Sequence, residues 1–172
     1  MTKTLTDENY YNEHAALLGG VTLAWNDCHY MVLSIFHTLS GLSCGTELDD
    51  FLALKFDNLR RERTLERMKE VLNTENDLDM RECGIQLLDQ LSKLTGDRNV
   101  ATHTMWALMM PARSEPEFQP RPGLPWPKNL DTDFKSQFSN LTTRLRKLCR
   151  ELLDYNAALR VHLEQNVGRP RC

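Results

Sequence analysis

The fold is decided by the stretch from Phe134 to Leu159, whose sequence is FKSQFSNLTTRLRKLCRELLDYNAAL. Its apolar residues recur at alternating steps of four and three, the spacing of the narrow seam of a coiled-coil-like helix. We predict a helix from about Thr132 to Glu164 that packs against the first helix, a second copy of itself, or both. The seam consists of Phe134, Phe138, Leu141, Leu145, Leu148, Leu152, Tyr155 and Leu159, and His162 continues the same spacing.

Earlier stretches of the chain also space their apolar residues as helices do. In the far half of the first stretch, a second apolar row of Tyr30, Leu33 and Phe36 predicts a helix that is buried almost all round. A glycine at position 96 ends the last of these stretches, so we predict that the chain bends there and that Asp97 caps a new start. The predicted helices cover about 7–42, 47–55, 59–73 and 78–95.

Prolines interrupt the chain before the last helix. Six of the 7 prolines lie between Pro111 and Pro127, a density that no helix survives. We predict a proline-rich loop over residues 111–130, with a short hairpin as one form of it, that is either a flap facing a substrate or an insertion without a role. We therefore predict an all-α, up-and-down bundle of four to five helices, one domain over residues 1–172 with a flexible tail at 167–172.

Composition limits the functional classes. The net charge of −3 excludes a protein covered in positive potential, so any nucleic acid must bind at a local basic patch. Five scattered cysteines without a C-x-x-C pair predict reduced thiols, with neither a disulfide framework nor a zinc site. No stretch is long and apolar enough for a membrane span, and we expect a cytoplasmic protein.

Two groups of basic residues stand out on predicted helices. The first is either a solvent-exposed face with glutamates between the basic residues or a surface that binds phosphates. The second lies on the last helix, beside its apolar seam. The first group consists of Arg60, Arg61, Arg63, Arg67 and Lys69, and the second of Arg144, Arg146, Lys147 and Arg150.

The chemistry concentrates in Gly96–His103, GDRNVATH. An arginine grips phosphate oxygens through a planar fork of donors, and a histidine moves protons near neutral pH. Arg98 and His103 are five residues apart, which is off a common face of a continuous helix. The pair therefore works together only if Arg98 lies in a bend, or if a second subunit completes the site. Asn99 is placed to orient either partner.

The string Arg98-Asn99-Val100-Ala101-Thr102-His103 resembles the R-x4-6-H motif of the HEPN superfamily. In that family an asparagine often follows the arginine, and an alanine-containing apolar turn often precedes the histidine. The helical frame is similar from about Leu17 to Glu164. In the toxin branch a tyrosine commonly lies two residues after the histidine, whereas this chain has Met105, so no role that depends on that tyrosine is expected.

The resemblance implies a helical bundle that forms a homodimer, with the motifs of two subunits facing one another in a cleft. It implies a metal-independent endoribonuclease, a toxin or defence protein, with Arg98 and His103 catalytic and Asn99 as a polar helper. RNA or a nucleotide phosphate, and an antitoxin or regulatory protein, are the implied partners, with no metal ion, cofactor or membrane. The alternative is a non-catalytic dimer that acts as a nucleotide- or RNA-binding or protein-interaction module.

Overall fold

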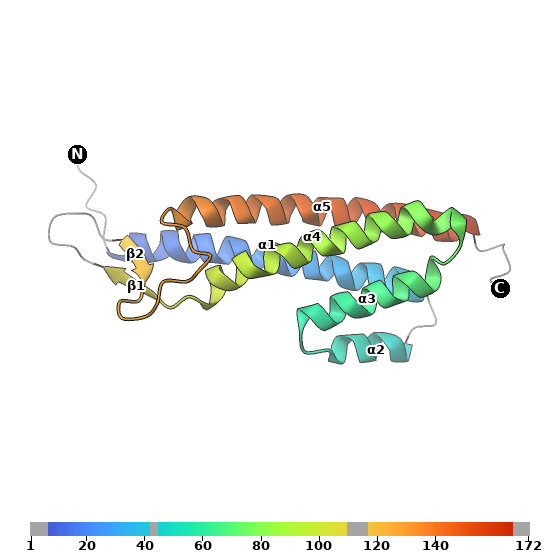
Figure 1. The fold of residues 1–172 in the computed structure, drawn as a ribbon, viewed down its shortest axis with the longest axis horizontal. Helices are drawn as coiled ribbons and strands as arrows, with labels where there is room; N and C mark the ends of the chain where they lie inside the picture. The colour runs from blue at the N-terminus through green and yellow to red at the C-terminus, as the bar shows by residue number, and fades with distance from the viewer. Residues whose placement is uncertain (1–6, 42–44, 110–116, 167–172) are drawn as a thin grey trace. The chain divides into compact units, whose positions relative to one another are not determined.

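The computed structural model describes residues 7–41, 45–109 and 117–166. Within them the predicted all-α fold is confirmed, since five helices carry the chain and the two strands form one small antiparallel ribbon (Figure 1). The predicted tail at 167–172 lies outside the described residues. The elements are α1 Asp7–Ser40, α2 Gly45–Ala53, α3 Asp57–Val71, the 3-10 turn η1 Glu75–Asp77, α4 Leu78–His103, β1 Trp106–Met109, β2 Glu117–Pro120 and α5 Phe134–Asn166.

The chain divides into two compact units, and α1, α4 and α5 contribute residues to both. The first unit comprises residues 1–25 and 94–144. In it, α5 packs on α1 where Thr142 faces Gly20, and α5 reaches α4 where Arg144 Nη1 lies 3.6 Å from Asp97 Oδ2. The ribbon also belongs to this unit, with Trp106 opposite Pro120 and Met109 opposite Glu117.

The second unit comprises residues 26–93 and 145–172 and includes α2 and α3. Helix α5 again packs on α1, since the Cys28 thiol donates to the Leu145 carbonyl at 3.3 Å. Helix α2 joins α1 through stacked rings of Phe36 and Phe51, whose centroids are 4.2 Å apart. The prediction that the last helix packs against the first is therefore confirmed in each unit.

The apolar seam of α5 is buried as predicted, with every seam residue from Phe134 to Leu159 at most 7% exposed. The prediction of an α1 buried nearly all round is wrong, because Tyr30 is 68% exposed whereas Phe36 is buried. One face of α1 meets its neighbours, and Tyr30 lies on the other side of the helix. Spacing identifies apolar rows, but only packing selects which of two rows is covered.

Polar contacts of Asp77 link the turn before α4 to His162 of α5 in the second unit. Asp77 accepts hydrogen bonds from the backbone N–H and hydroxyl of Thr74, at 3.1 and 2.7 Å, and its other oxygen lies 2.7 Å from His162 Nε2. Burial raises the pKa of Asp77, but these hydrogen bonds outweigh it and hold the pKa below its usual value. The carboxylate therefore stays ionised where α4 begins.

None of the helices in the described part of the chain has the length and apolar character that a membrane span requires.

Gly84 lies where α4 closely approaches side chains of α3 and α5 in the second unit. A methyl group at this position would lie 2.6 Å from Met68 Cε and would also meet the Tyr155 hydroxyl. Met68 is 0% exposed and Tyr155 5%, so neither side chain has solvent to move into. A larger residue at position 84 of α4 therefore fits only if the side chain of Met68 or Tyr155 shifts.

Gly84→Ala is therefore expected to lower the free energy of unfolding. Overpacking costs about 1–3 kcal/mol, more than the roughly 0.5–1 kcal/mol that a helix gains when alanine replaces glycine. Gly19→Ala is the matched control, since no atom lies within 4 Å of its added methyl and only the gain should appear. Urea unfolding of both variants measures the difference, and equal stabilisation of the two would contradict the tight contact.

Candidate functional site

The helix that carries Gly96–His103 does not stop at the glycine. Helix α4 continues to His103, and the backbone N–H of Thr104 closes its last turn on the Val100 carbonyl at 3.3 Å. A glycine inside a helix costs only about 1 kcal/mol. Leu94 and Ala101 are buried on either side of it, which holds this part of the helix against its neighbours. The predicted bend at Gly96 and the predicted cap at Asp97 are therefore wrong.

Arg98 is held in place by groups of its own chain. Its guanidinium carbon lies 5.4 Å from the centroid of the buried Trp25 ring, a cation–π contact. Its Nη1 donates to Asn99 Oδ1 at 3.1 Å. Its Nε is buried and has no hydrogen-bond partner among the described residues. The arginine and the amide of the predicted site are thus brought together, with the arginine half-buried.

Arg98 and His103 are not brought together within one chain. On a continuous helix five residues turn by about 140°, so the two side chains leave α4 on different sides. Asn99 and His103 are four residues apart and share a face, and both are exposed. Of the three predicted site residues, Arg98 is therefore held by Trp25 and Asn99, whereas the side chains of Asn99 and His103 are exposed.

Asn99 and His103 border a pocket of about 540 Å³ in the first unit. One wall is the last turn of α4 and the residues after it, and the other is the segment that follows β2. Most of the lining is apolar, and none of the lining side chains that the structure describes is a carboxylate. The lining residues are Asn99, Val100, His103, Thr104, Met105, Pro120, Arg121, Leu124, Pro125 and Pro127.

The proline-rich segment reaches this pocket because the chain turns back as a hairpin. The hairpin differs from the one allowed for in residues 111–130, because only its second strand, β2, lies there and its first strand, β1, precedes the proline-rich loop. Residues 110–116 between the strands lie outside the described part. The backbone N–H of Arg121 then donates to the Met105 carbonyl at 2.7 Å. The sequence analysis did not identify Arg121, because nothing in the local sequence distinguishes it from Arg113 and Lys128, the other cations of the proline-rich stretch.

The pocket is suited to an anionic ligand with an apolar part. It combines an imidazole, an amide and a guanidinium with walls of proline, valine and leucine side chains. In the described ranges, no three His, Cys, Asp or Glu side chains are grouped as metal ligands would be. What the described residues can supply at this site is hydrogen bonding, positive charge and proton transfer by His103.

A buried aromatic cluster supports the hairpin that forms the pocket wall. The ring of His14 on α1 stacks on Phe118 of β2, with centroids 4.2 Å apart, and meets Trp106 of β1 edge-on at 4.8 Å. Both ring nitrogens of His14 are buried without a hydrogen-bond partner in the described part of the chain. Burial, with a smaller contribution from the charge of Lys135, lowers the pKa of His14 from 6.5 to about 4.

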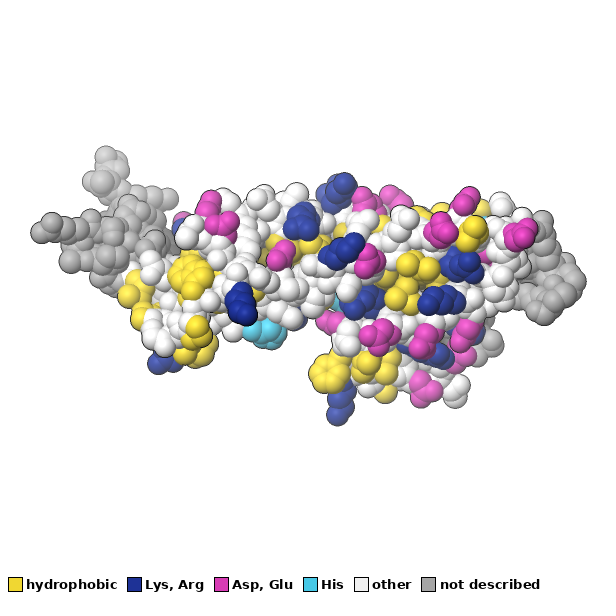
Figure 2. Space-filling model, in the orientation of Figure 1, with side chains coloured by type: hydrophobic (Ala, Val, Ile, Leu, Met, Phe, Trp, Pro, Cys, Tyr) yellow, Lys and Arg dark blue, Asp and Glu magenta, His cyan; other side chains and the backbone are white. Residues whose placement is uncertain are grey.

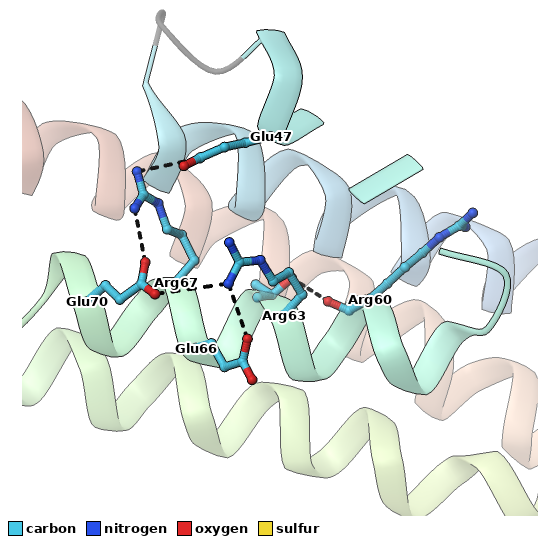
Figure 3. Close-up of polar contacts among 7 residues, drawn as sticks. Glu47, Arg60, Arg63, Glu66, Arg67 and Glu70 are labelled. Atoms are coloured by element: carbon cyan, nitrogen blue, oxygen red, sulfur yellow. Dashed lines mark hydrogen bonds and ion pairs between the residues drawn. The ribbon is translucent and has the colours of Figure 1, made fainter. Parts of the chain in front are cut away.

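Two of the basic residues of α3, Arg63 and Arg67, form ion pairs with acidic neighbours (Figure 3). Arg67 Nη1 lies 3.0 Å from Glu70 Oε2, and Arg67 Nη2 lies 3.6 Å from Glu47 Oε2. Arg63 Nη1 lies 3.2 Å from Glu66 Oε2. The Arg60 guanidinium donates to the backbone carbonyl of Leu54 at 3.1 Å. These contacts favour the interpretation of this group as a solvent-exposed face over that of a phosphate-binding surface.

The charges on the face shown in Figure 2 are mixed in the same way. Acidic side chains lie between the basic ones around α2 and α3. On α5, Arg144 lies 3.6 Å from Asp97, and Lys147 lies 3.6 Å from Glu151. The surface formed by these paired charges would therefore bind a polyanion only weakly.

Comparison of the chain with protein-family models, with curated proteins and with solved structures finds no match.

The buried His14 is expected to make stability depend on pH. Its pKa is about 4 in the folded protein and 6.5 in the unfolded chain, so the unfolded chain binds the proton more tightly. The stability that His14 contributes is complete above pH 6.5 and is lost as the pH falls through 4. At about 1.36 kcal/mol per pKa unit, the loss is about 3 kcal/mol.

Urea unfolding between pH 7.5 and pH 4, for the wild type and for His14→Leu, measures this loss. Leucine keeps the apolar contacts and cannot bind a proton, so the wild type should lose about 3 kcal/mol more than the variant. Carboxylates that titrate in the same range are common to both proteins and cancel. The same loss in both would show that His14 is accessible to protons in the folded state.

Proposed function

We propose that this protein is a metal-independent endoribonuclease in which His103 transfers the proton. The observation that carries the proposal is the pocket at the end of α4, where the imidazole of His103 and the amide of Asn99 border apolar walls and no described lining side chain is a carboxylate. The phosphodiester of RNA is an anion that links nucleosides whose flat bases have apolar faces, and such a pocket would not repel it. The resemblance of Arg98–His103 to the HEPN motif supports the same assignment.

The reaction would use the 2′-hydroxyl of the RNA as nucleophile. Its oxygen bonds to the adjacent phosphorus as the bond from phosphorus to the 5′-oxygen breaks, which leaves a 2′,3′-cyclic phosphate and a 5′-hydroxyl. Neutral His103 accepts the proton of the 2′-hydroxyl, or protonated His103 donates one to the departing 5′-oxygen. A nearby guanidinium stabilises the charge that develops on the phosphate oxygens.

The proposal includes a homodimer. Within one chain Arg98 points away from His103, so a facing subunit is the arrangement that would bring the Arg98 of one copy to the His103 of the other. Asn99, which accepts a hydrogen bond from Arg98 and borders the pocket with His103, is placed to link the two roles. In the cell, such an activity belongs to a toxin or defence protein, with an antitoxin or other regulatory protein as partner.

A second candidate is a module that binds RNA, a nucleotide or a protein without cleavage. It is favoured by the engagement of Arg98 with Trp25 and Asn99, because a guanidinium held in this way acts as a structural anchor. Under this alternative, replacement of His103 changes the affinity for a ligand, and the wild type has no RNA cleavage that the replacement would reduce.

His103→Ala is expected to lower kcat/KM for RNA cleavage at least about 100-fold, because general acid–base catalysis contributes about 10²–10⁴. The assay contains EDTA and compares wild type and variant at matched folded concentration, with detection of cyclic-phosphate ends. His37→Ala is the matched control, since this histidine is exposed on α1 and does not border the pocket.

Cleavage by the wild type and by the control, but not by His103→Ala, supports the ribonuclease. A wild type that binds single-stranded or duplex RNA and cuts neither would leave the binding module as the function.

A further inference from the structure

Arg121 has a fixed backbone position beside His103. It directly follows β2, and its N–H donates to the carbonyl of Met105, two residues after His103. Its own carbonyl accepts the Leu124 N–H at 3.3 Å, in a turn that contains Gly123 at a φ of +85°. That φ lies in the left-handed region, which glycine adopts without strain. The turn therefore holds the backbone of Arg121 at the rim of the pocket.

The side chain of Arg121, in contrast, has no hydrogen bond or ion pair with the side chains that the structure describes. It is exposed, and no carboxylate in the described ranges forms an ion pair with it. Arg98, on the same helix end as the pocket, is instead stacked on Trp25 and bonded to Asn99. Of these two guanidinium groups, Arg121 is the one that borders the pocket with His103 in the same chain.

The walls around Arg121 are mainly apolar, a surface suited to the face of a flat ring. Met105 is 54% exposed and Leu124 50%, so both offer apolar surface that a ligand would cover. A volume of about 540 Å³ is within the range of about 300–1,000 Å³ that small-molecule sites occupy. A single nucleotide combines such a ring, its base, with a phosphate that a guanidinium binds through paired hydrogen bonds.

We infer that Arg121 binds the phosphate of one nucleotide whose base lies in the pocket between the end of α4 and the proline-rich segment. The inference deepens the proposed function and rests on it for the view that this nucleotide belongs to an RNA strand. It makes Arg121 a phosphate-binding residue in the same chain as His103, and it makes the proline-rich segment a wall that holds substrate. A free nucleotide presents the same phosphate and base, so the test includes both forms.

Calorimetric titration in EDTA tests the inference with two probes, a nucleoside 3′-monophosphate and a 2′-O-methylated RNA pentamer that cannot be cleaved. Arg121→Gln is expected to raise the Kd at least tenfold, which corresponds to about 1.4 kcal/mol. Arg121→Lys should recover part of the affinity, because a lysine keeps the charge but not the planar fork. Lys128→Gln, an exposed cation of the same segment that does not border the pocket, should change the Kd less than twofold.

Each outcome has a defined meaning once circular dichroism shows that the variants are folded. Binding of both probes that depends on Arg121 supports the inference. Binding of the mononucleotide alone, with the same dependence, supports the site and assigns it to free nucleotides. Equal effects of Arg121→Gln and Lys128→Gln, or no binding of either probe to the wild type, overturn it. Arg121-dependent binding by a wild type that cuts no RNA would refute the ribonuclease and leave the site in place.

Discussion

Burial of the apolar face of α5 is the constraint on which both units depend. In the first unit this face supplies Phe134, Phe138 and Leu141, and in the second it continues to Leu159, with every seam position nearly or fully buried. Each fully buried large side chain contributes about 1.5–3 kcal/mol relative to an exposed one. Because the seam alternates steps of four and three over the length of the helix, α5 presents one continuous surface for α1 to cover.

The titratable groups Cys28 and Tyr155 are buried in this packing in their neutral forms, because burial disfavours the charged form. Burial, more than the neighbouring Cys149 and Asp27, raises the pKa of the Cys28 thiol to about 12, so the thiol stays protonated and donates to the Leu145 carbonyl. Burial also raises the pKa of Tyr155, whose hydroxyl lies 3.7 Å from the Met68 sulfur. Where a charge is kept, at Asp77, hydrogen bonds from Thr74 stabilise the carboxylate.

The candidate site combines a rigid part with a surface part. The last turn of α4 places Asn99 and His103 on one face, and Trp25 and Asn99 hold Arg98 on another. The hairpin, packed through Phe118 on the ring of His14, brings the proline-rich segment to the same helix end. Prolines restrict the backbone on this wall, so the pocket does not depend on ordering a flexible loop when a ligand binds.

The sequence by itself determined the helices and most of their buried faces, because apolar spacing is a local property that burial then satisfies. It also allowed for a hairpin in the proline-rich stretch, where only the second strand lies, and it identified Arg98, Asn99 and His103 as candidate site residues. Only the tertiary structure decided that α4 continues through Gly96, because the cost of one glycine is smaller than the packing on both sides of it. It likewise decided that Tyr30 is exposed and that Arg98 is anchored on Trp25. Arg121 reaches the pocket of His103 through a turn of the chain, and no local spacing encodes a contact between residues so far apart in the sequence.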